Sequence, residues 1–140
     1  MTFKVKKIIF LCLFSLNVNA GERWAIDCVS GKGSIIIEHD KADVIVNTNQ
    51  IVVSTRVVKT DDKLSFFLEE PADLERGGMM LNWDDFSNSK PIADAQKNGD
   101  KIKLSWKGFF ESSTLKYVWV SDSEFTAPKN EKYVIMKKCE

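Results

Sequence analysis

The stretch ADAQKNGDKIKL, residues 93–104, carries the strongest local signal in the sequence. It places Asn98-Gly99 between two segments in which apolar and polar residues alternate, the pattern of a β-hairpin closed by a two-residue type I′ turn. Such a turn sets Lys97 opposite Asp100 and Ala95 opposite Ile102. The stretch therefore predicts two antiparallel strands that share one apolar face.

The rest of the chain repeats this theme. Short β-branched and aromatic runs recur between turn signals, and no long segment has a helical period. The main runs are Ile35–Ile37, Val44–Val46, Ile51–Val58 and Leu64–Leu68. Because Ile51–Val58 is apolar on both faces, it favours a covered or closed sheet. We expect one all-β domain over residues 21–140, an antiparallel β-barrel or β-sandwich of about eight strands.

One segment is expected to be helical. Pro71 suits the first turn of a helix and Gly77 suits its C-terminal cap, so a short helix is predicted near residues 71–76. Extended structure is expected to resume at Met79–Trp83. A polar exposed loop is expected over Asp84–Pro91.

The first twenty residues have the layout of a secretory signal peptide. Three lysines at positions 4, 6 and 7 precede an apolar run, and Val18-Asn19-Ala20 supplies small residues for cleavage. The run is shorter than the ~20 residues of a membrane-spanning helix, and no later segment approaches that length. We expect residues 1–20 to be cleaved and the domain to reach the periplasm, with secretion as the alternative.

Cleavage would discard Cys12 and leave Cys28 and Cys139. In an oxidising compartment an even pair of cysteines indicates a disulfide, here between the first strand and the last residues. We expect Cys28 on the inward face of its strand, and Cys139 on one face with Tyr133 and Ile135. No Cys-x-x-Cys motif is present, which disfavours a redox or metal site.

The net charge of the chain indicates which class of binding partner it suits. The chain holds 20 basic and 20 acidic residues, and the three leader lysines would be lost on export. A mildly acidic domain does not fit nucleic acid, which requires a basic face. It is better suited to a basic protein partner.

The acidic residues concentrate in the middle of the chain. Trp83-Asp84-Asp85-Phe86 places two carboxylates between aromatic rings. Paired carboxylates can serve glycosidic chemistry or bind calcium, but a solvated loop or an acidic docking surface is the simpler interpretation. These four residues are candidate partner-binding residues.

Phe109 and Phe110 are further candidates. Adjacent residues of a strand point to opposite faces, so only one ring can enter a one-sided core. The other would be a natural anchor for a partner, because aromatic rings dominate binding hot spots.

No pattern of catalytic residues stands out. His39 beside Asp40 permits a Ser-His-Asp hypothesis, but no nucleophile-elbow sequence accompanies it. We therefore expect no enzyme activity, no cofactor and no metal site.

The layout of the chain resembles that of the small periplasmic inhibitors of C-type lysozyme. The residues that carry the resemblance are Cys28, Trp106-Lys107-Gly108-Phe109 and Cys139. The sequence departs from that family at the inhibitory loop, a Ser-Gly-x-x-Tyr type motif, where Ser30-Gly31 is followed by Ser34 in place of tyrosine. The resemblance implies a protein-binding inhibitor.

Three functions remain open at this point. The first is a protein-binding module that inhibits or neutralises a cell-wall hydrolase or a toxin. The second is a carrier of a small ligand or lipid in a barrel lumen. The third is a structural subunit or adhesin of a surface assembly.

Overall fold

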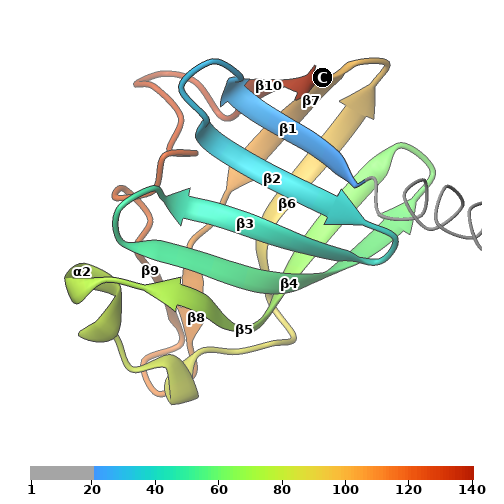
Figure 1. Ribbon diagram of the computed structural model, residues 1–140. Helices are drawn as coiled ribbons and strands as arrows, with labels where there is room; N and C mark the ends of the chain where they lie inside the picture. Colours follow the sequence, from blue (N-terminus) through green and yellow to red (C-terminus); the bar gives the residue numbers. More distant parts are fainter. Residues whose placement is uncertain (1–20) are drawn as a thin grey trace, which may run out of the picture.

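The computed structural model describes residues 21–140 and contains ten strands (Figure 1). Eight of them form one closed antiparallel barrel in the order β1-β10-β7-β6-β5-β4-β3-β2. The barrel strands are β1 (Glu22–Asp27), β2 (Lys32–Glu38), β3 (Lys41–Asn47), β4 (Ile51–Thr60), β5 (Lys63–Leu74), β6 (Pro91–Asn98), β7 (Lys101–Trp106) and β10 (Val134–Cys139). The predicted all-β class is confirmed, and the barrel is the correct alternative. The leader expected over residues 1–20 lies outside the described residues.

A disulfide joins Cys28, directly after β1, to Cys139 at the end of β10. Their Cα atoms are 5.6 Å apart. The predicted pairing is confirmed. β1 and β10 are also hydrogen-bonded neighbours, so the bridge reinforces the seam at which the first and last strands close the barrel.

The barrel interior is filled by side chains. The largest fully buried ones include Trp24, Phe66, Phe109, Phe125 and Met136. Along β4, buried Ile51, Val53, Thr55 and Val57 alternate with more exposed residues, as expected for a strand with one face in a barrel core. Side chains from several strands therefore occupy the centre of the barrel.

The hairpin of residues 93–104 forms, but its predicted register was wrong. Asn98 pairs with Lys101 and Ala95 with Leu104, so the two turn residues are Gly99 and Asp100. Gly99 has φ +65°, whereas Asn98 and Asp100 do not have positive φ. Only the first central residue requires positive φ, as in a type II′ turn. The register differs from the predicted one by two residues, and an even shift keeps every side chain on its face, so the predicted apolar face is preserved.

The predicted short helix is present but lies later in the chain, as α2 (Arg76–Met79). Residues 71–74 belong instead to β5, where Pro71 pairs with Val53 next to a β-bulge. β6 pairs with β5 only up to Phe67. Pro71 lies outside this paired stretch, so its lack of an N–H costs no hydrogen bond to β6. None of the described helices is long and apolar enough to span a membrane.

Two smaller expectations were wrong and a third is confirmed. Residues 79–83 are not extended: they leave α2 and enter the 3₁₀ turn η1 (Trp83–Asp85). The expected shared face of Ile135 and Cys139 in β10 is confirmed: it is the outward face, because Ile135 is 49% exposed while Met136 is fully buried. Cys28 lies just after β1 and is only half-buried, whereas Trp24 of the same strand is buried.

A small second sheet closes one end of the barrel. It consists of β8 (Phe109–Glu111) and β9 (Lys116–Val118), and Figure 1 shows it near α2 and η1. Gly108 precedes it with φ +110°, and a Cβ at this position would lie 2.5 Å from the carbonyl oxygen of Val118. The close approach of the two chains therefore requires glycine.

Candidate functional site

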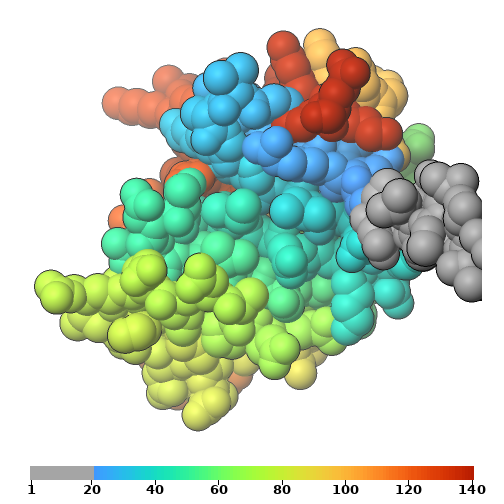
Figure 2. Space-filling model, viewed as in Figure 1, coloured from blue at the N-terminus to red at the C-terminus, as the bar shows by residue number. Residues whose placement is uncertain are grey.

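The acidic segment identified in the sequence forms a protrusion at the end of the barrel that carries the β8–β9 sheet. We call residues 70–86 the acidic lobe. It contains five acidic residues and one basic residue, Arg76. Figure 2 shows this part of the chain, in lime to olive, standing out from one corner of the molecule. It comprises the end of β5, α2 and η1.

The two carboxylates of the predicted pair have different environments. Asp85 binds the β8–β9 turn: its side chain accepts hydrogen bonds from the backbone N–H and the hydroxyl of Ser113. Its carbonyl oxygen accepts a hydrogen bond from the Ser112 N–H at 2.8 Å. Asp84 is exposed and takes part in no ion pair among the described residues. Asp85 thus holds the β8–β9 turn in place, whereas the Asp84 side chain is exposed to solvent.

The aromatic candidates form the base of the lobe. The rings of Phe86 and Phe109 stack with centroids 5.2 Å apart, and Trp83 packs edge-on against both. Trp106 from β7 packs edge-on against Phe109 from the barrel side. Phe109 is fully buried and Phe86 is 9% exposed. These two predicted partner-binding residues are therefore buried and support the lobe from within.

Phe110 is the outward member of its pair, as the strand period predicts. Its ring packs edge-on against Tyr117 at 5.2 Å, and the amine of Lys90 lies 5.4 Å from its centroid. The Tyr117 hydroxyl donates a hydrogen bond to the carbonyl oxygen of Pro91. Burial, and then the negative charge of Asp94, raise the pKa of Tyr117, so it remains a neutral donor near neutral pH. Phe110 is half-buried, and its remaining exposed surface is available at the edge of the lobe.

The short helix α2 is fixed on two sides. Gln50, in the β3–β4 turn, accepts hydrogen bonds from the N–H groups of Gly77 and Glu75, through its side chain and its carbonyl oxygen respectively. From the other side, the indole N–H of Trp83 donates to the Gly78 carbonyl oxygen at 2.8 Å. A four-residue helix has little stability of its own, so these contacts hold it in place.

This fixed helix presents two methionines to solvent. Met79 is 65% exposed and Met80 is 81% exposed. Beside them, a shallow hollow of about 500 Å³ is lined in part by Arg76, Met80 and Trp119. Adjacent exposed methionines provide an adaptable apolar contact. Sequence reasoning missed them because it assigned an extended strand, although two apolar residues directly after Gly77-Gly78 were a visible signal.

The same lobe also carries several carboxylates. Glu70, Asp73, Glu75 and Asp84 form no ion pair within the described residues, whereas the neighbouring Glu69 is paired with Lys41 at 2.7 Å. The lobe thus combines an exposed apolar centre with unneutralised negative charge. A surface of this kind can attract a basic protein at long range and bury apolar area on contact.

His39 was the residue considered for a Ser-His-Asp site. His39 is exposed in the β2–β3 turn with φ +57°, and no hydrogen bond joins its side chain to another group in residues 21–140. Over the same residues, no three histidine, cysteine, aspartate or glutamate side chains come together as metal ligands.

The segment expected to match the inhibitory loop has a structural role of its own. Ser34 is buried and its hydroxyl donates to the Gly31 carbonyl oxygen at 2.6 Å, closing the β1–β2 turn. Comparison with known proteins adds no relative: no protein-family model matches the chain, and neither a curated protein nor a solved structure matches it. The resemblance to the lysozyme inhibitors therefore remains a prediction from the sequence.

Proposed function

We propose that this chain is an exported protein-binding module that inhibits or neutralises a basic protein, such as a cell-wall hydrolase or a toxin. The observation that carries the proposal is the acidic lobe, which exposes Met79 and Met80 and carries four carboxylates that form no ion pair within residues 21–140. The predicted leader places this activity in the periplasm, with secretion as the alternative.

Three properties of the lobe support a binding role. Its helix is held by Gln50 and Trp83, so binding would require little ordering of the backbone. Its base is a buried aromatic cluster, and hydrogen bonds from Ser113 hold Asp85, the residue next to Asp84. Its unpaired negative charge would speed association with a basic surface and restrict the choice of partner.

The experiment uses the full chain, expressed for export and purified in its oxidised form. Binding to a C-type lysozyme, and to basic proteins captured from envelope extract, is measured by calorimetry at two salt concentrations. The test variant is D73N/E75Q/D84N. A matched control, D40N/D100N/E131Q, removes three exposed carboxylates from other parts of the barrel.

The proposal expects the lobe variant to lose about tenfold or more in affinity and most of its salt dependence. The control should change the affinity by less than about threefold. A second variant, M79S/M80S, should weaken binding without altering the salt dependence. Equal losses in the lobe and control variants, or the absence of any saturable protein partner, would refute the proposal.

A further inference from the structure

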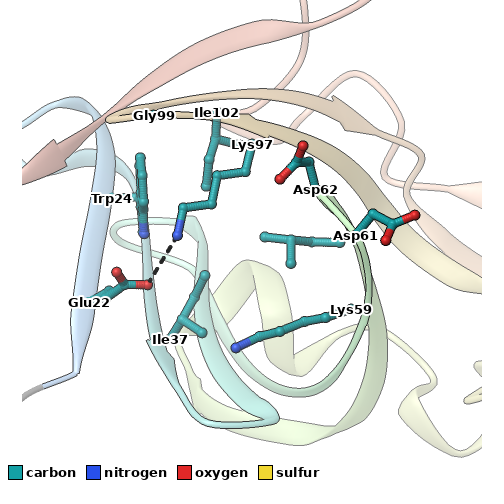
Figure 3. A pocket seen from close by; sticks show the side chains of 10 residues that line it. Glu22, Trp24, Ile37, Lys59, Asp61, Asp62, Lys97, Gly99 and Ile102 are labelled. Atoms are coloured by element: carbon teal, nitrogen blue, oxygen red, sulfur yellow. Dashed lines mark ion pairs between the residues drawn. The ribbon is translucent and has the colours of Figure 1, made fainter.

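The opposite end of the barrel contains a second, unrelated site. A cavity of about 270 Å³ opens between the first residues of β1, the β4–β5 turn and the β6–β7 turn (Figure 3). β4 runs from Ile51, next to the acidic lobe, to Thr60, next to this cavity, so the two sites lie at opposite ends of the strand. We call this cavity the mouth pocket.

The wall of the mouth pocket contains an unsatisfied hydrogen-bond donor. Trp24 is 1% exposed, and its indole Nε1 is buried without an acceptor in the described part of the chain. Figure 3 shows this nitrogen on the ring edge that faces the Glu22 carboxylate and the Lys97 amine. A buried N–H without an acceptor costs about 1–3 kcal/mol, so an acceptor supplied from outside would be favoured.

Two amines extend into the same space. Lys97 continues the inward-facing row of Ala93 and Ala95, and its Nζ lies 5.5 Å from the Trp24 ring centroid. It forms a loose ion pair with Glu22, dashed in Figure 3, in which the nearest carboxylate oxygen is 3.9 Å away and so beyond hydrogen-bond distance. Lys59 forms no ion pair among residues 21–140, and Figure 3 shows its amine directed into the pocket.

The acidic groups of the pocket do not satisfy these donors. Glu22 is closest to Lys138, at 3.1 Å. Partial burial tends to raise the pKa of Glu22, but the Lys138 hydrogen bond and the charges of Lys97, Lys138 and Lys59 lower it overall, so the carboxylate stays ionised. In Figure 3 the Asp61 carboxylate points away from the pocket, and Asp62 stands at the rim across from Trp24.

The remaining wall is apolar. Ile37, Leu64 and Ile102 line the pocket and are at most 6% exposed. The volume corresponds to about nine water molecules at the roughly 30 Å³ that each occupies in the liquid. The pocket therefore suits a ligand of about ten non-hydrogen atoms with an apolar body.

We propose that the mouth pocket binds a small monocarboxylate. One carboxylate oxygen accepts the Trp24 indole N–H, the amines of Lys97 and Lys59 neutralise the charge, and the apolar body packs against Ile37, Leu64 and Ile102. Charge-assisted hydrogen bonds of this kind are about twice as strong as neutral ones. A neutral or cationic ligand of the same shape would lack this contact with the two amines.

Benzoate is the probe that tests this proposal, with benzamide as its neutral counterpart and benzylamine as its cationic one. Each is titrated at constant ionic strength into the exported, oxidised protein labelled with ¹⁵N. The chain has four tryptophans and therefore four indole N–H signals. The Trp24 indole signal is identified as the one that disappears in the W24F variant.

Benzoate should shift the Trp24 signal saturably, with a Kd on the order of millimolar, as expected for so small a ligand. K97M and K59M should each weaken binding by about tenfold, while the exposed K101M should not. Each variant's unfolding midpoint is measured alongside, so that unfolding is not taken for lost binding. The proposal is overturned if benzoate gives no saturable shift, if benzamide binds as well, or if neither lysine substitution weakens binding. The pocket would then hold only water.

Discussion

The ring of Phe86, on the acidic lobe, stacks on the ring of Phe109, on β8, with centroids 5.2 Å apart and planes 13° apart. This pair joins two segments that are more than twenty residues apart in the sequence. Trp83 and Trp106 pack edge-on against Phe109 from either side. The lobe therefore rests on the barrel core.

Replacing Phe109 by alanine should lower the free energy of unfolding by about 3–5 kcal/mol, because a fully buried ring is removed from a packed cluster. Phe110→Ala is the matched control. It removes a half-buried ring and should cost less than about half as much. Urea unfolding followed by tryptophan fluorescence measures both variants, and equal costs would show that the cluster does not anchor the lobe.

Gly108 and Gly99 offer a second comparison. Both have positive φ. A Cβ at position 108 would lie 2.5 Å from the Val118 carbonyl oxygen, whereas a Cβ at position 99 would have no atom within 4 Å. G108A should therefore cost about 2–3 kcal/mol and G99A about 1 kcal/mol. Thermal unfolding tests this order, and a more harmful G99A would contradict the described path of the chain at β8.

The disulfide between Cys28 and Cys139 spans a sequence separation of 111 residues. A loop of that length is expected to contribute about 4–5 kcal/mol by restricting the unfolded chain. C28A/C139A should lose roughly this amount in chemical denaturation. Reduction of the wild-type protein should reproduce the loss, and a reduced protein as stable as the oxidised one would show that the strand seam alone holds the termini.

Much of the fold follows from periodicity in the sequence. The alternation of apolar residues in β3 and β4 predicts which side chains are buried, and two cysteines in a domain that is expected to be exported predict the bridge. The errors arise where local preference and tertiary pairing disagree. Pro71 and Ala72 suit a helix, but pairing of Ile51–Val53 with the end of β5 draws this segment into the barrel.

The hairpin error has a similar origin. Asn98-Gly99 is a good type I′ turn, yet β7 is also paired with β10, through Ile102 and Met136 among others. Closing the barrel requires both pairings at once, and a single hairpin cannot reveal that constraint.

The candidate sites were predicted to different degrees. The charge and the aromatic residues of the acidic lobe are visible in the sequence, but not which of Asp84 and Asp85 is free. The mouth pocket could not be found, because Trp24 and Lys97 meet only when the barrel closes. The one available signal was Lys97, a charged residue at the position where the inward-facing row of Ala93 and Ala95 would continue.

The cluster around Glu22 predicts a pH dependence. The pKa of Glu22 is lowered in the folded protein, below its ordinary value of about 4.3. The carboxylate therefore stabilises the fold at neutral pH, and this contribution is lost as the pH falls through the lowered pKa. Because the side chain is 39% exposed, the effect should be under about 1 kcal/mol.

E22Q measures this contribution. Urea unfolding at pH 7 should show the wild type as the more stable protein, and the difference should shrink by about pH 3. A difference that is the same at both values would show that Glu22 does not act through its charge.

The most direct test of the proposed function is photo-crosslinking in living cells. A photoreactive amino acid replaces Met80 in the acidic lobe, and in a control strain it replaces Ile135, which is also exposed but lies on β10. The proposal predicts one discrete adduct with an envelope protein from position 80 and none from position 135. Adducts of equal yield at both positions, or no protein adduct from position 80, would contradict it.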